Sequence, residues 1–508
     1  MLKKLCQCLG LSSLILVVNY GDLLGGGADI RMHTPFRVAS MCWAQITDIL
    51  LVALLLFILL TLAARTRIYP WVRLVIAIVI PPYLIQRTQS FFPFDLIEGL
   101  VIILLVVWAA VLLLLLLRFG KLYKRLMRVG SLIAASLVIF ALSSIAQLLW
   151  VATWKPAPNQ INAAWETTPQ PPRTHPLLVW IVFDELSYDQ VFEHRARDLN
   201  LPNFDALRAQ STLFTQTQPA GYHTVKILPS LLTGKIVDGI RYNFHNRLWV
   251  HHESESGWQP IDGAQTVFAE AEQTGWRTAA VGWYNPYCAI YGDAIQNCYW
   301  TNHDMFDGLM SQGAPFWTNV YTPLQQVVRE LKSPSRADRD LCTFDVRHRY
   351  QTETDLQQHA FQLLHTDQAD FVFIHLAIPH SPNIWSRIQD NYTQFCDSSY
   401  LDNLALTDRV LGRILGTLRA SPRWNQTSLI VEGDHGWRID AWNWLPAWTQ
   451  EDDAASRGVF DQRPALLIHQ PGQSQPETVA QTWPLIQVHS VVEQILHGQI
   501  PTFQTSSP

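Results

Sequence analysis

The stretch Ser428-Leu-Ile-Val-Glu-Gly-Asp434-His435-Gly436-Trp437 places an Asp and a His side by side on a glycine-flanked turn, directly after a short apolar run. The run has the length and composition of a buried strand. An Asp-His pair at the end of a strand can bind a divalent metal ion. In an open α/β sheet, the carboxyl ends of strands far apart in sequence converge on one crevice. The stretch therefore predicts such a sheet, with a metal site at its carboxyl edge.

Two earlier segments can complete this site. Asp184 and Glu185 follow the apolar run 177–183, and Thr224 stands in the loop that begins at Gly221. We expect an acid, the Thr224 hydroxyl and the Asp-His pair to share one ion. Successive residues of an extended strand point to opposite faces, so only one of the two neighbouring acids is expected to bind it.

Thr224 is expected near the amino terminus of a helix. Residues 225–232 suit a helix apart from Pro229, which is tolerated in a first turn. Free N–H groups and the helix dipole at such an end favour a phosphate or a sulfate. Taken alone, Thr224 fits an ordinary helix cap better than a nucleophile.

From residue 177 onward, short apolar runs alternate with helical spacing of apolar residues. This alternation predicts a doubly wound, mostly parallel α/β sandwich over 177–508. The expected strands are 177–183, 278–283, 371–376, 428–431 and 465–468, and the expected helices are 203–210, 266–274, 355–364 and 400–418.

Residues 1–152 are predicted to form a helical transmembrane domain, because most of the long charge-free stretches lie there. Basic clusters near 3–4, 65–67 and 118–128 fall on one side of the membrane if the amino terminus is cytoplasmic and there are five crossings. The large domain is then extracytoplasmic on a multi-pass cytoplasmic-membrane protein. A cleaved signal peptide in place of the first span gives the same placement. The five candidate spans are 5–20, 44–64, 69–86, 96–117 and 129–152.

The proline-rich stretch 153–176 is predicted to be a semi-rigid linker between the two domains. A formal net charge of -5, with no basic tract in the large domain, argues against nucleic acid as a partner.

Four of the seven cysteines lie in the extracytoplasmic part. Two disulfides are possible there, and three pairings are open, as are four reduced thiols. We favour Cys288 with Cys298, a short loop, which leaves Cys342 for Cys396.

The ordered set of motifs resembles the sulfatase-like branch of the alkaline phosphatase superfamily over residues 177–472. The nucleophile loop of that branch ends in a Thr-Gly pair about ten residues after the nucleophile, which makes Thr224 the nucleophile here. The matching segments are Pro202-Asn-Phe-Asp-Ala-Leu207, Thr224 with Thr233-Gly234, Pro379-His380-Ser381-Pro382, Gly433-Asp434-His435-Gly436 and Pro471-Gly472.

One departure from the branch affects the expected chemistry. Sulfatases carry a cysteine, converted to formylglycine, where this chain has Thr224. A threonine nucleophile after a membrane domain is similar to lipoteichoic acid synthases and phosphoethanolamine transferases. This resemblance implies one divalent ion, Mn or Zn, with Mg or Ca as alternatives. It also implies a membrane phospholipid donor of phosphoethanolamine or phosphoglycerol type, a phosphothreonine intermediate, and an envelope glycan or lipid acceptor. We expect a monomer.

The resemblance also assigns roles to further residues. Asp184 aligns with the Phe-Asp of related phosphodiesterases and is preferred to Glu185 as the ligand. His380 is expected to bind the head group or to protonate the leaving oxygen. His375 is a weaker candidate for substrate binding, and His223 and Lys226, which flank the nucleophile, are others.

Two alternative functions stay open. Hydrolysis, with water as the acceptor, shares its first step with transfer. A non-catalytic membrane sensor would retain the fold without using Thr224.

Overall fold

A computed structural model describes residues 1–25, 31–87, 98–162, 175–243, 247–303, 310, 314–332, 334–445 and 447–503. The chain divides into two compact units. The helical unit holds 1–27, 37–155 and 309–337, and the sheet unit holds 28–36, 156–308 and 338–508. Two segments therefore depart from the predicted domain boundaries: 28–36 packs with the sheet unit, and 309–337 packs with the helical unit.

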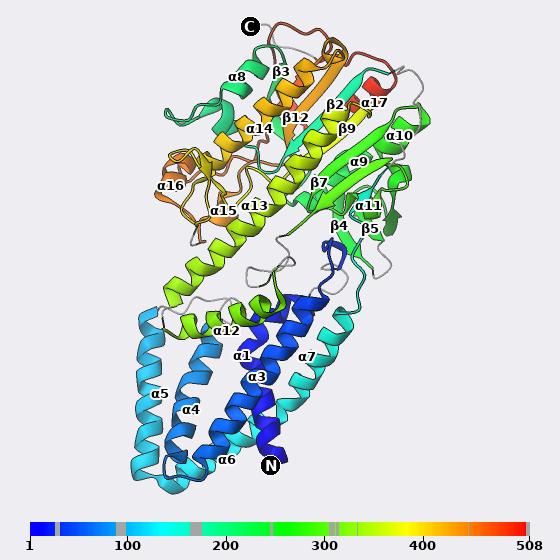
Figure 1. Ribbon diagram of the computed structural model, residues 1–508. Coiled ribbons are helices and arrows are strands. Elements are labelled where there is room, and N and C mark those ends of the chain that lie inside the picture. Colours follow the sequence, from blue (N-terminus) through cyan, green and yellow to red (C-terminus); the bar gives the residue numbers. More distant parts are fainter. Residues whose placement is uncertain are drawn as a thin grey trace. The chain divides into compact units, whose positions relative to one another are not determined.

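Four of the candidate spans overlap one helix each, and the fifth, 129–152, covers the end of α6 and all of α7. Helix α1 packs against α3, α6 and α7 (Figure 1). The stretches Ala39–Ala63 and Gly120–Val151 are long and apolar enough to cross a membrane, which suggests membrane anchoring. Five crossings stay a prediction. The basic residues of 118–128, expected in a loop, lie largely in α6. The helices are α1 (Leu2–Gly25), α3 (Ala39–Ala63), α4 (Tyr69–Arg87), α5 (Glu98–Arg118), α6 (Gly120–Ser136), α7 (Val138–Val151) and α12 (Phe316–Lys332).

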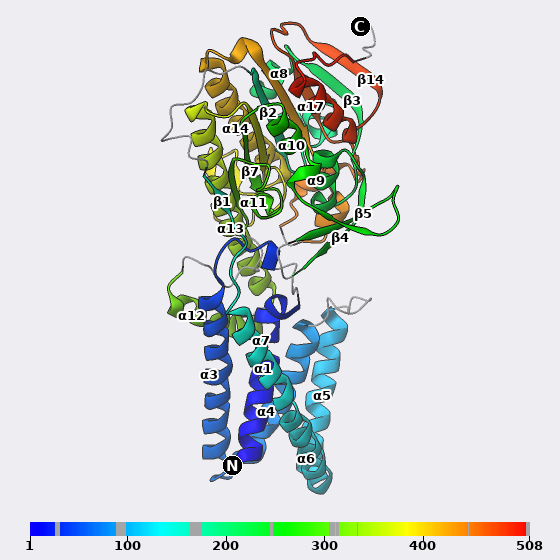
Figure 2. The same ribbon diagram turned by 90° about the vertical axis from the view of Figure 1, so that its right-hand side faces the viewer.

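The sheet unit is built on a nine-stranded sheet, whose strands are parallel except β1 and β13. Figure 2 shows β2, β3, β7 and β14 of this sheet. Three predicted strands, 177–183, 278–283 and 371–376, have the observed bounds. In sheet order the strands are β1 (Gln160–Ile161), β8 (Asn297–Thr301), β7 (Thr278–Trp283), β9 (Phe371–Leu376), β2 (Leu177–Phe183), β12 (Thr427–Gly433), β13 (Leu466–His469), β3 (Thr212–Gln218) and β14 (Glu477–Pro484).

Two small sheets and further helices complete this unit. The small sheets pair β4 (Val237–Tyr242), β5 (Leu248–His252) and β6 (Trp258–Ile261), and β10 (Trp385–Ser386) with β11 (Asn391–Tyr392). The helices are α8 (Pro202–Arg208), α9 (Thr224–Thr233), α10 (Val267–Gln273), α11 (Tyr287–Ile290), α13 (Pro334–Thr366), α14 (Tyr400–Ala420), α15 (Ile439–Trp442), α16 (Gln450–Ser456) and α17 (Val488–Leu496).

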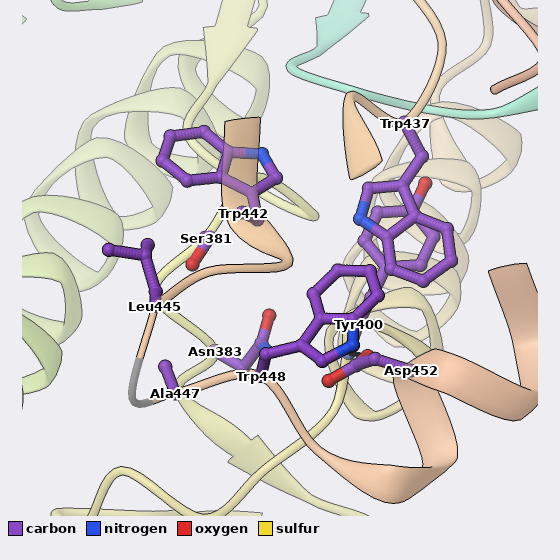
Figure 3. A pocket seen from close by; sticks show the side chains of 9 residues that line it. All are labelled: Ser381, Asn383, Tyr400, Trp437, Trp442, Leu445, Ala447, Trp448 and Asp452. Atoms are coloured by element: carbon purple, nitrogen blue, oxygen red, sulfur yellow. Dashed lines mark hydrogen bonds between the residues drawn. The ribbon is translucent and has the colours of Figure 1, made fainter. Parts of the chain in front are cut away.

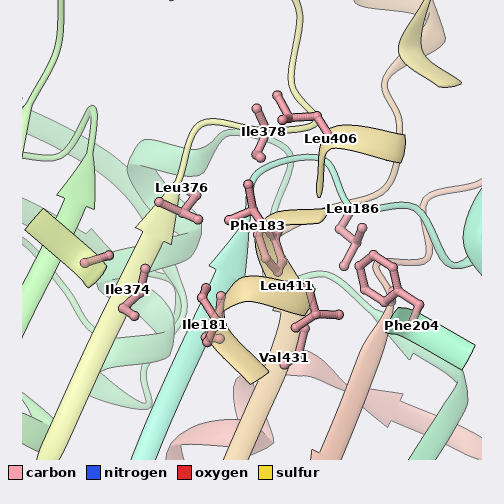
Figure 4. Close-up of a cluster of buried hydrophobic side chains, with 14 of the residues drawn as sticks. Ile181, Phe183, Leu186, Phe204, Ile374, Leu376, Ile378, Leu406, Leu411 and Val431 are labelled. Atoms are coloured by element: carbon pink, nitrogen blue, oxygen red, sulfur yellow. The ribbon is translucent and has the colours of Figure 1, made fainter. Parts of the chain in front are cut away.

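Helices cover both faces of the large sheet, as the alternating pattern predicts. Ile181 and Phe183 of β2 join one apolar cluster with α8, α13 and α14 (Figure 4). Trp180 and Val182 join the other, with α9, α10 and α17. Successive side chains of a strand point to opposite faces, so this central strand is apolar along its whole length.

The register of the central strands positions the site. In the parallel pair β2–β12, Phe183 lies opposite Gly433. The next residue of each strand is an aspartate, so the two carboxylates emerge side by side. On the other side of β2, His375 of β9 pairs with Val182, one residue before the end of β2.

The first part of the predicted linker is incorporated in the sheet unit. Ala157 is buried, residues 160–161 form β1 at the sheet edge, and the Trp300 indole donates to the Pro158 carbonyl (2.7 Å). Residues 163–174 of the linker lie outside the described residues.

Both favoured disulfides are confirmed: Cys288–Cys298 and Cys342–Cys396 have Cα atoms 5.6 and 5.8 Å apart.

Candidate active site

Three buried side chains from the ends of β2 and β12 converge at the carboxyl edge of the sheet. Asp184, Asp434 and His435 place one potential ligand atom each within 4.8 Å of one another. Thr224 reaches them from α9: its hydroxyl donates to Asp184 Oδ2 over 3.1 Å and lies 3.3 Å from His435 Nε2. The structure thus brings together the acid, hydroxyl and Asp-His pair that the sequence assigned to one site.

The donor atoms of this cluster fit a bound cation. The Gly436 carbonyl accepts from His435 Nδ1 (2.9 Å), which leaves a lone pair on Nε2 of the neutral ring. That nitrogen lies 3.2 Å from Asp434 Oδ2 and 3.7 Å from Asp184 Oδ1, and neither oxygen receives a hydrogen bond from the described chain. Buried lone pairs that face one another are costly unless a cation lies between them. Oxygen and imidazole ligands suit Mn or Zn.

The pKa shifts of the two aspartates agree with a cation site in this cluster. Burial raises the pKa of Asp434, and the Asp184 carboxylate raises it further. The pKa of Asp184 is lowered, because His380, His375 and His435 together outweigh its burial. A cation in the cluster would remove the repulsion between the two carboxylates.

The glycines around the Asp-His pair permit close backbone approach. A Cβ on Gly433 would collide with the backbone of Leu186, and one on Gly436 would collide with the Asp461 carbonyl. Neither glycine has a positive φ. Their role is therefore to let other chain segments pack against the turn, rather than to form a left-handed turn.

Helix α9 begins at Thr224, as predicted, with the extended His223 before it. Pro229 is the sixth residue of this helix and not part of its first turn. Gly234 ends the helix with φ +70°, the left-handed conformation that favours glycine.

Glu185 points away from the metal-ligand cluster. Its carboxylate accepts from Arg438 Nε (2.8 Å) and from the Trp442 indole (2.8 Å). Its φ of +66° is unusual for a residue with a side chain and turns the chain where β2 ends. Asp184, and not Glu185, is therefore the acid placed to bind an ion.

A cavity of about 250 Å³ opens over Thr224. Two buried guanidinium groups, from Arg349 of α13 and Arg438, line it. Arg438 also donates to the Tyr222 carbonyl (3.2 Å), and Arg349 lies over the Trp283 ring at 4.1 Å and donates to Ala377 O (2.9 Å). Two fixed guanidinium groups beside a hydroxyl suit a tetrahedral oxyanion such as phosphate or sulfate. The remaining lining residues are His223, Val225, Tyr284, Asn302 and His380.

His380 lies at this cavity between the rings of Trp283 and Trp442, at centroid distances of 5.0 and 4.9 Å. Burial, opposed by Glu185 and Asp184, lowers the pKa of His380 to about 4. Its Nδ1 bonds the Ser381 carbonyl, so the neutral ring carries its lone pair on Nε2. At neutral pH this ring accepts a hydrogen bond or a proton, which does not suit the expected role as an acid.

The other three residues predicted to contact the substrate differ in where they lie. His223 lines the cavity. His375 lies behind it, with Nε2 3.4 Å from Asp184 Oδ2 and Nδ1 2.9 Å from the Tyr287 hydroxyl. Lys226 turns away and donates to the Asp238 carbonyl (2.7 Å).

The aromatic residues after the Asp-His pair form a packed layer beside the site. Trp437 stacks on Tyr400 at 4.3 Å and on Trp448 at 5.3 Å (Figure 3). The pocket between them and Trp442 is about 10 Å³, room for about one water. Trp444 is 73% exposed. Packing therefore explains most of these aromatics.

Sequence reasoning missed the two arginines and a segment near the amino terminus. Arg438 follows the Asp-His pair closely, which is a usable signal, whereas Arg349 lies in a long helix with no local motif. His33 packs on Tyr284 of the cavity wall (centroids 4.5 Å), and its carbonyl accepts from Asn302 (3.3 Å). No sequence pattern indicates that a segment between two apolar helices supports the cavity.

The chain has weak similarity to several solved structures. No curated protein matches the chain. Similar solved structures include the phosphonate monoester hydrolase of Agrobacterium radiobacter, with 14% identity over 63% of this chain and 74% of that chain (TM-score 0.38). The PsFucS1 sulfatase from Pseudoalteromonas sp. has 14% identity over 64% and 68% (TM-score 0.41). Murine ectonucleotide pyrophosphatase/phosphodiesterase 5, solved in an inactive form with AMP, has 11% identity over 65% and 97% (TM-score 0.36).

The sequence model of the Sulfatase family matches residues 176–497. This range covers Thr224, both arginines, the Asp-His pair and every strand of the large sheet except β1. The chain therefore belongs to the Sulfatase family and is an enzyme.

Proposed function

We propose that this protein is a metal-dependent transferase that moves a phospho-head group from a membrane phospholipid to an envelope acceptor through a phosphothreonine at Thr224. The acceptor is a glycan or a lipid, and the head group is of phosphoethanolamine or phosphoglycerol type. The apolar helices anchor the enzyme in the cytoplasmic membrane, and the sheet unit works at its outer face.

One observation carries the proposal: the Thr224 hydroxyl lies between a cluster of unpaired buried ligand atoms and a cavity lined by two arginines. A threonine cannot become formylglycine, so the sulfatase route is closed to it. Phosphoryl transfer requires a positioned nucleophile and cationic groups around the phosphoryl oxygens, and both are present.

Asp184, Asp434, His435 and Thr224 would hold the divalent ion. When bound, this ion lowers the pKa of the threonine hydroxyl and offsets charge on the phosphoryl group. Asp184 orients the Thr224 hydroxyl through their hydrogen bond.

In the first step, Thr224 Oγ1 bonds to phosphorus, and the bond from phosphorus to the diacylglycerol oxygen breaks. The threonine proton leaves and the departing alkoxide gains one. Arg349 and Arg438 bind the non-bridging oxygens in this step.

In the second step, the acceptor hydroxyl attacks the phosphothreonine, and the bond between phosphorus and Thr224 Oγ1 breaks. The neutral His380 ring can accept the proton of that hydroxyl through Nε2, which suits a base for the second step.

Mass spectrometry of the purified full chain tests this proposal. Incubation with phosphatidylethanolamine or phosphatidylglycerol vesicles should add the head-group phosphate to the peptide that holds Thr224. Thr224→Ala should show no adduct, whereas Thr233→Ala, the same change at the other end of α9, should retain it. Adduct followed by a modified glycan or lipid acceptor supports transfer. Free phosphorylated head group with no acceptor product assigns hydrolysis instead. A lipid and envelope-glycan profile indifferent to Thr224→Ala would point to a non-catalytic role.

A further inference from the structure

Helix α12 carries an exposed apolar stripe. Trp317, Tyr321 and Val328 are 68%, 60% and 49% exposed. Their spacing of four and seven residues places them along one face of the helix. Large apolar side chains in a row on a helix indicate a surface that is covered by something else.

The neighbouring face of α12 is already covered. Val320 and Pro323 are buried, and the helix packs against α3. Met310, just before α12, accepts from the Gln45 amide of α3 (3.0 Å). The stripe is therefore continuous with a face packed on a helix that is apolar and long enough to span a bilayer. On its other side lies the exposed Thr318, so the exposed surface of α12 changes from apolar to polar around the helix.

The position of α12 in the helical unit also indicates which partner covers the stripe. The helix runs across the amino-terminal end of α3 instead of along it (Figure 1). Below this contact, α3 exposes Leu50, Leu51 and Leu54. Tryptophan and tyrosine are enriched where a membrane protein passes through the headgroup region.

We propose that α12 lies in the headgroup region of a phospholipid bilayer, with Trp317, Tyr321 and Val328 facing the lipid. This proposal rests on the membrane placement in the proposed function and adds a second contact besides the spanning helices. An amphipathic helix of this kind binds in the plane of the interface with its apolar face down.

Residues of the cavity flank α12 in the sequence. Asn302 of the cavity wall precedes α12, and Arg349 of the cavity lies in α13, which follows it. We expect this lipid contact to favour turnover of a substrate whose phosphate lies at the depth of the lipid headgroups.

Spin labelling of the full chain in phosphatidylglycerol-containing vesicles tests the contact. Cys6, Cys8 and Cys42 are first replaced, and both disulfides are kept. Labels at 317, 321 and 328 should collide mainly with oxygen, which partitions into lipid. Labels at 318 and 329 should collide mainly with a water-soluble nickel chelate. Equal access of the chelate at all five sites, or access of neither reagent at the stripe, overturns the proposal, since the stripe is then in water or under protein.

A kinetic experiment separates this inference from the proposed function. Trp317→Asp with Tyr321→Asp should lower turnover of vesicle phospholipid about tenfold while leaving turnover of a water-soluble aryl phosphodiester unchanged. The matched control, Thr318→Asp, should change neither rate. Equal rates on vesicles for the double variant and the parent overturn the role of α12, even where Thr224 still forms its adduct. Absence of any adduct instead defeats the proposed function and leaves the spin-label result to stand by itself.

Discussion

The two sides of the active site differ in whether their buried carboxylates are paired with a cation. On one side, Asp184 and Asp434 face a histidine lone pair, and two of their oxygens have no donor among the described residues. On the other side, Glu185 is fully paired with Arg438 and Trp442. Asp184 and Glu185 are consecutive, so neighbouring residues face a site whose ligand atoms fit a cation and a site that already contains a guanidinium cation. A buried carboxylate whose oxygens lack a hydrogen-bond donor is therefore a better candidate for a metal ligand than a buried carboxylate that is already paired.

The strongest test of this comparison replaces Asp184 by Asn. The change removes one negative ligand and one acceptor for the Thr224 hydroxyl, so we expect a loss of activity on the order of 10³-fold or more. Bound Mn or Zn per protein, measured by elemental analysis, should fall with it. Retention of a full equivalent of metal would remove Asp184 from the ligand set.

Arg438→Lys tests the paired side. A lysine keeps the charge but loses the planar fork that contacts Glu185 and the Tyr222 carbonyl together. We expect a loss of about 10²-fold in kcat/KM with the metal content unchanged. Loss of metal would show that the two sides are one site.

His380 provides a test by pH. Its folded pKa of about 4 lies below its usual 6.5, so the folded protein holds fewer protons between these values. Stability is therefore present above about pH 6.5 and is lost as the pH falls toward 4. At pH 5 the loss is at most about 2 kcal/mol. His380→Gln should show a smaller drop in thermal midpoint between pH 7.5 and pH 5 than the parent. Equal drops would show that His380 is not held neutral by burial.

Glu185→Gln is the matched partner of the Asp184 change. Glutamine can still accept from Arg438 but no longer neutralises it, so the guanidinium should lose some of its fixed position. We expect a loss of about tenfold, mainly in KM, with metal retained. A loss as large as that of Asp184→Asn, together with loss of metal, would reassign the ligand to Glu185.

The sequence predicts the acidic side of the site better than the basic side. Asp184, Asp434 and His435 directly follow strands whose apolar pattern is visible, and the parallel register brings strand ends together. Arg349 approaches from the middle of α13, where only tertiary packing decides which residue faces the cavity. The sequence favours Asp184 over Glu185 as the ligand, but it does not indicate the positive φ of Glu185 that turns the chain at this point.

The fold shows the same division. Buried central strands have a continuous apolar signal, and three of them were predicted to the residue. Edge strands such as β1 and β14, and the segments exchanged between the units, have no such signal. Their position depends on neighbours that are distant in sequence. Strand β1, for example, forms where Asn159 to Ile161 pair with the edge of β8.

The smallest expected effect concerns His33, on the cavity wall and far from both charged groups in sequence. Its ring packs on Tyr284 and Tyr242, at 4.5 and 4.9 Å. His33→Ala should therefore raise KM about threefold to fivefold while kcat and metal content stay close to those of the parent. His33→Phe, which restores a ring, should recover most of the loss, and Arg37→Ala, at an exposed position just beyond the segment, should change nothing. If His33→Ala lowers only the thermal midpoint, with KM unchanged, the segment supports the fold of the sheet unit without shaping the cavity. A raised KM that phenylalanine restores instead means that a segment between two apolar helices takes part in positioning the substrate.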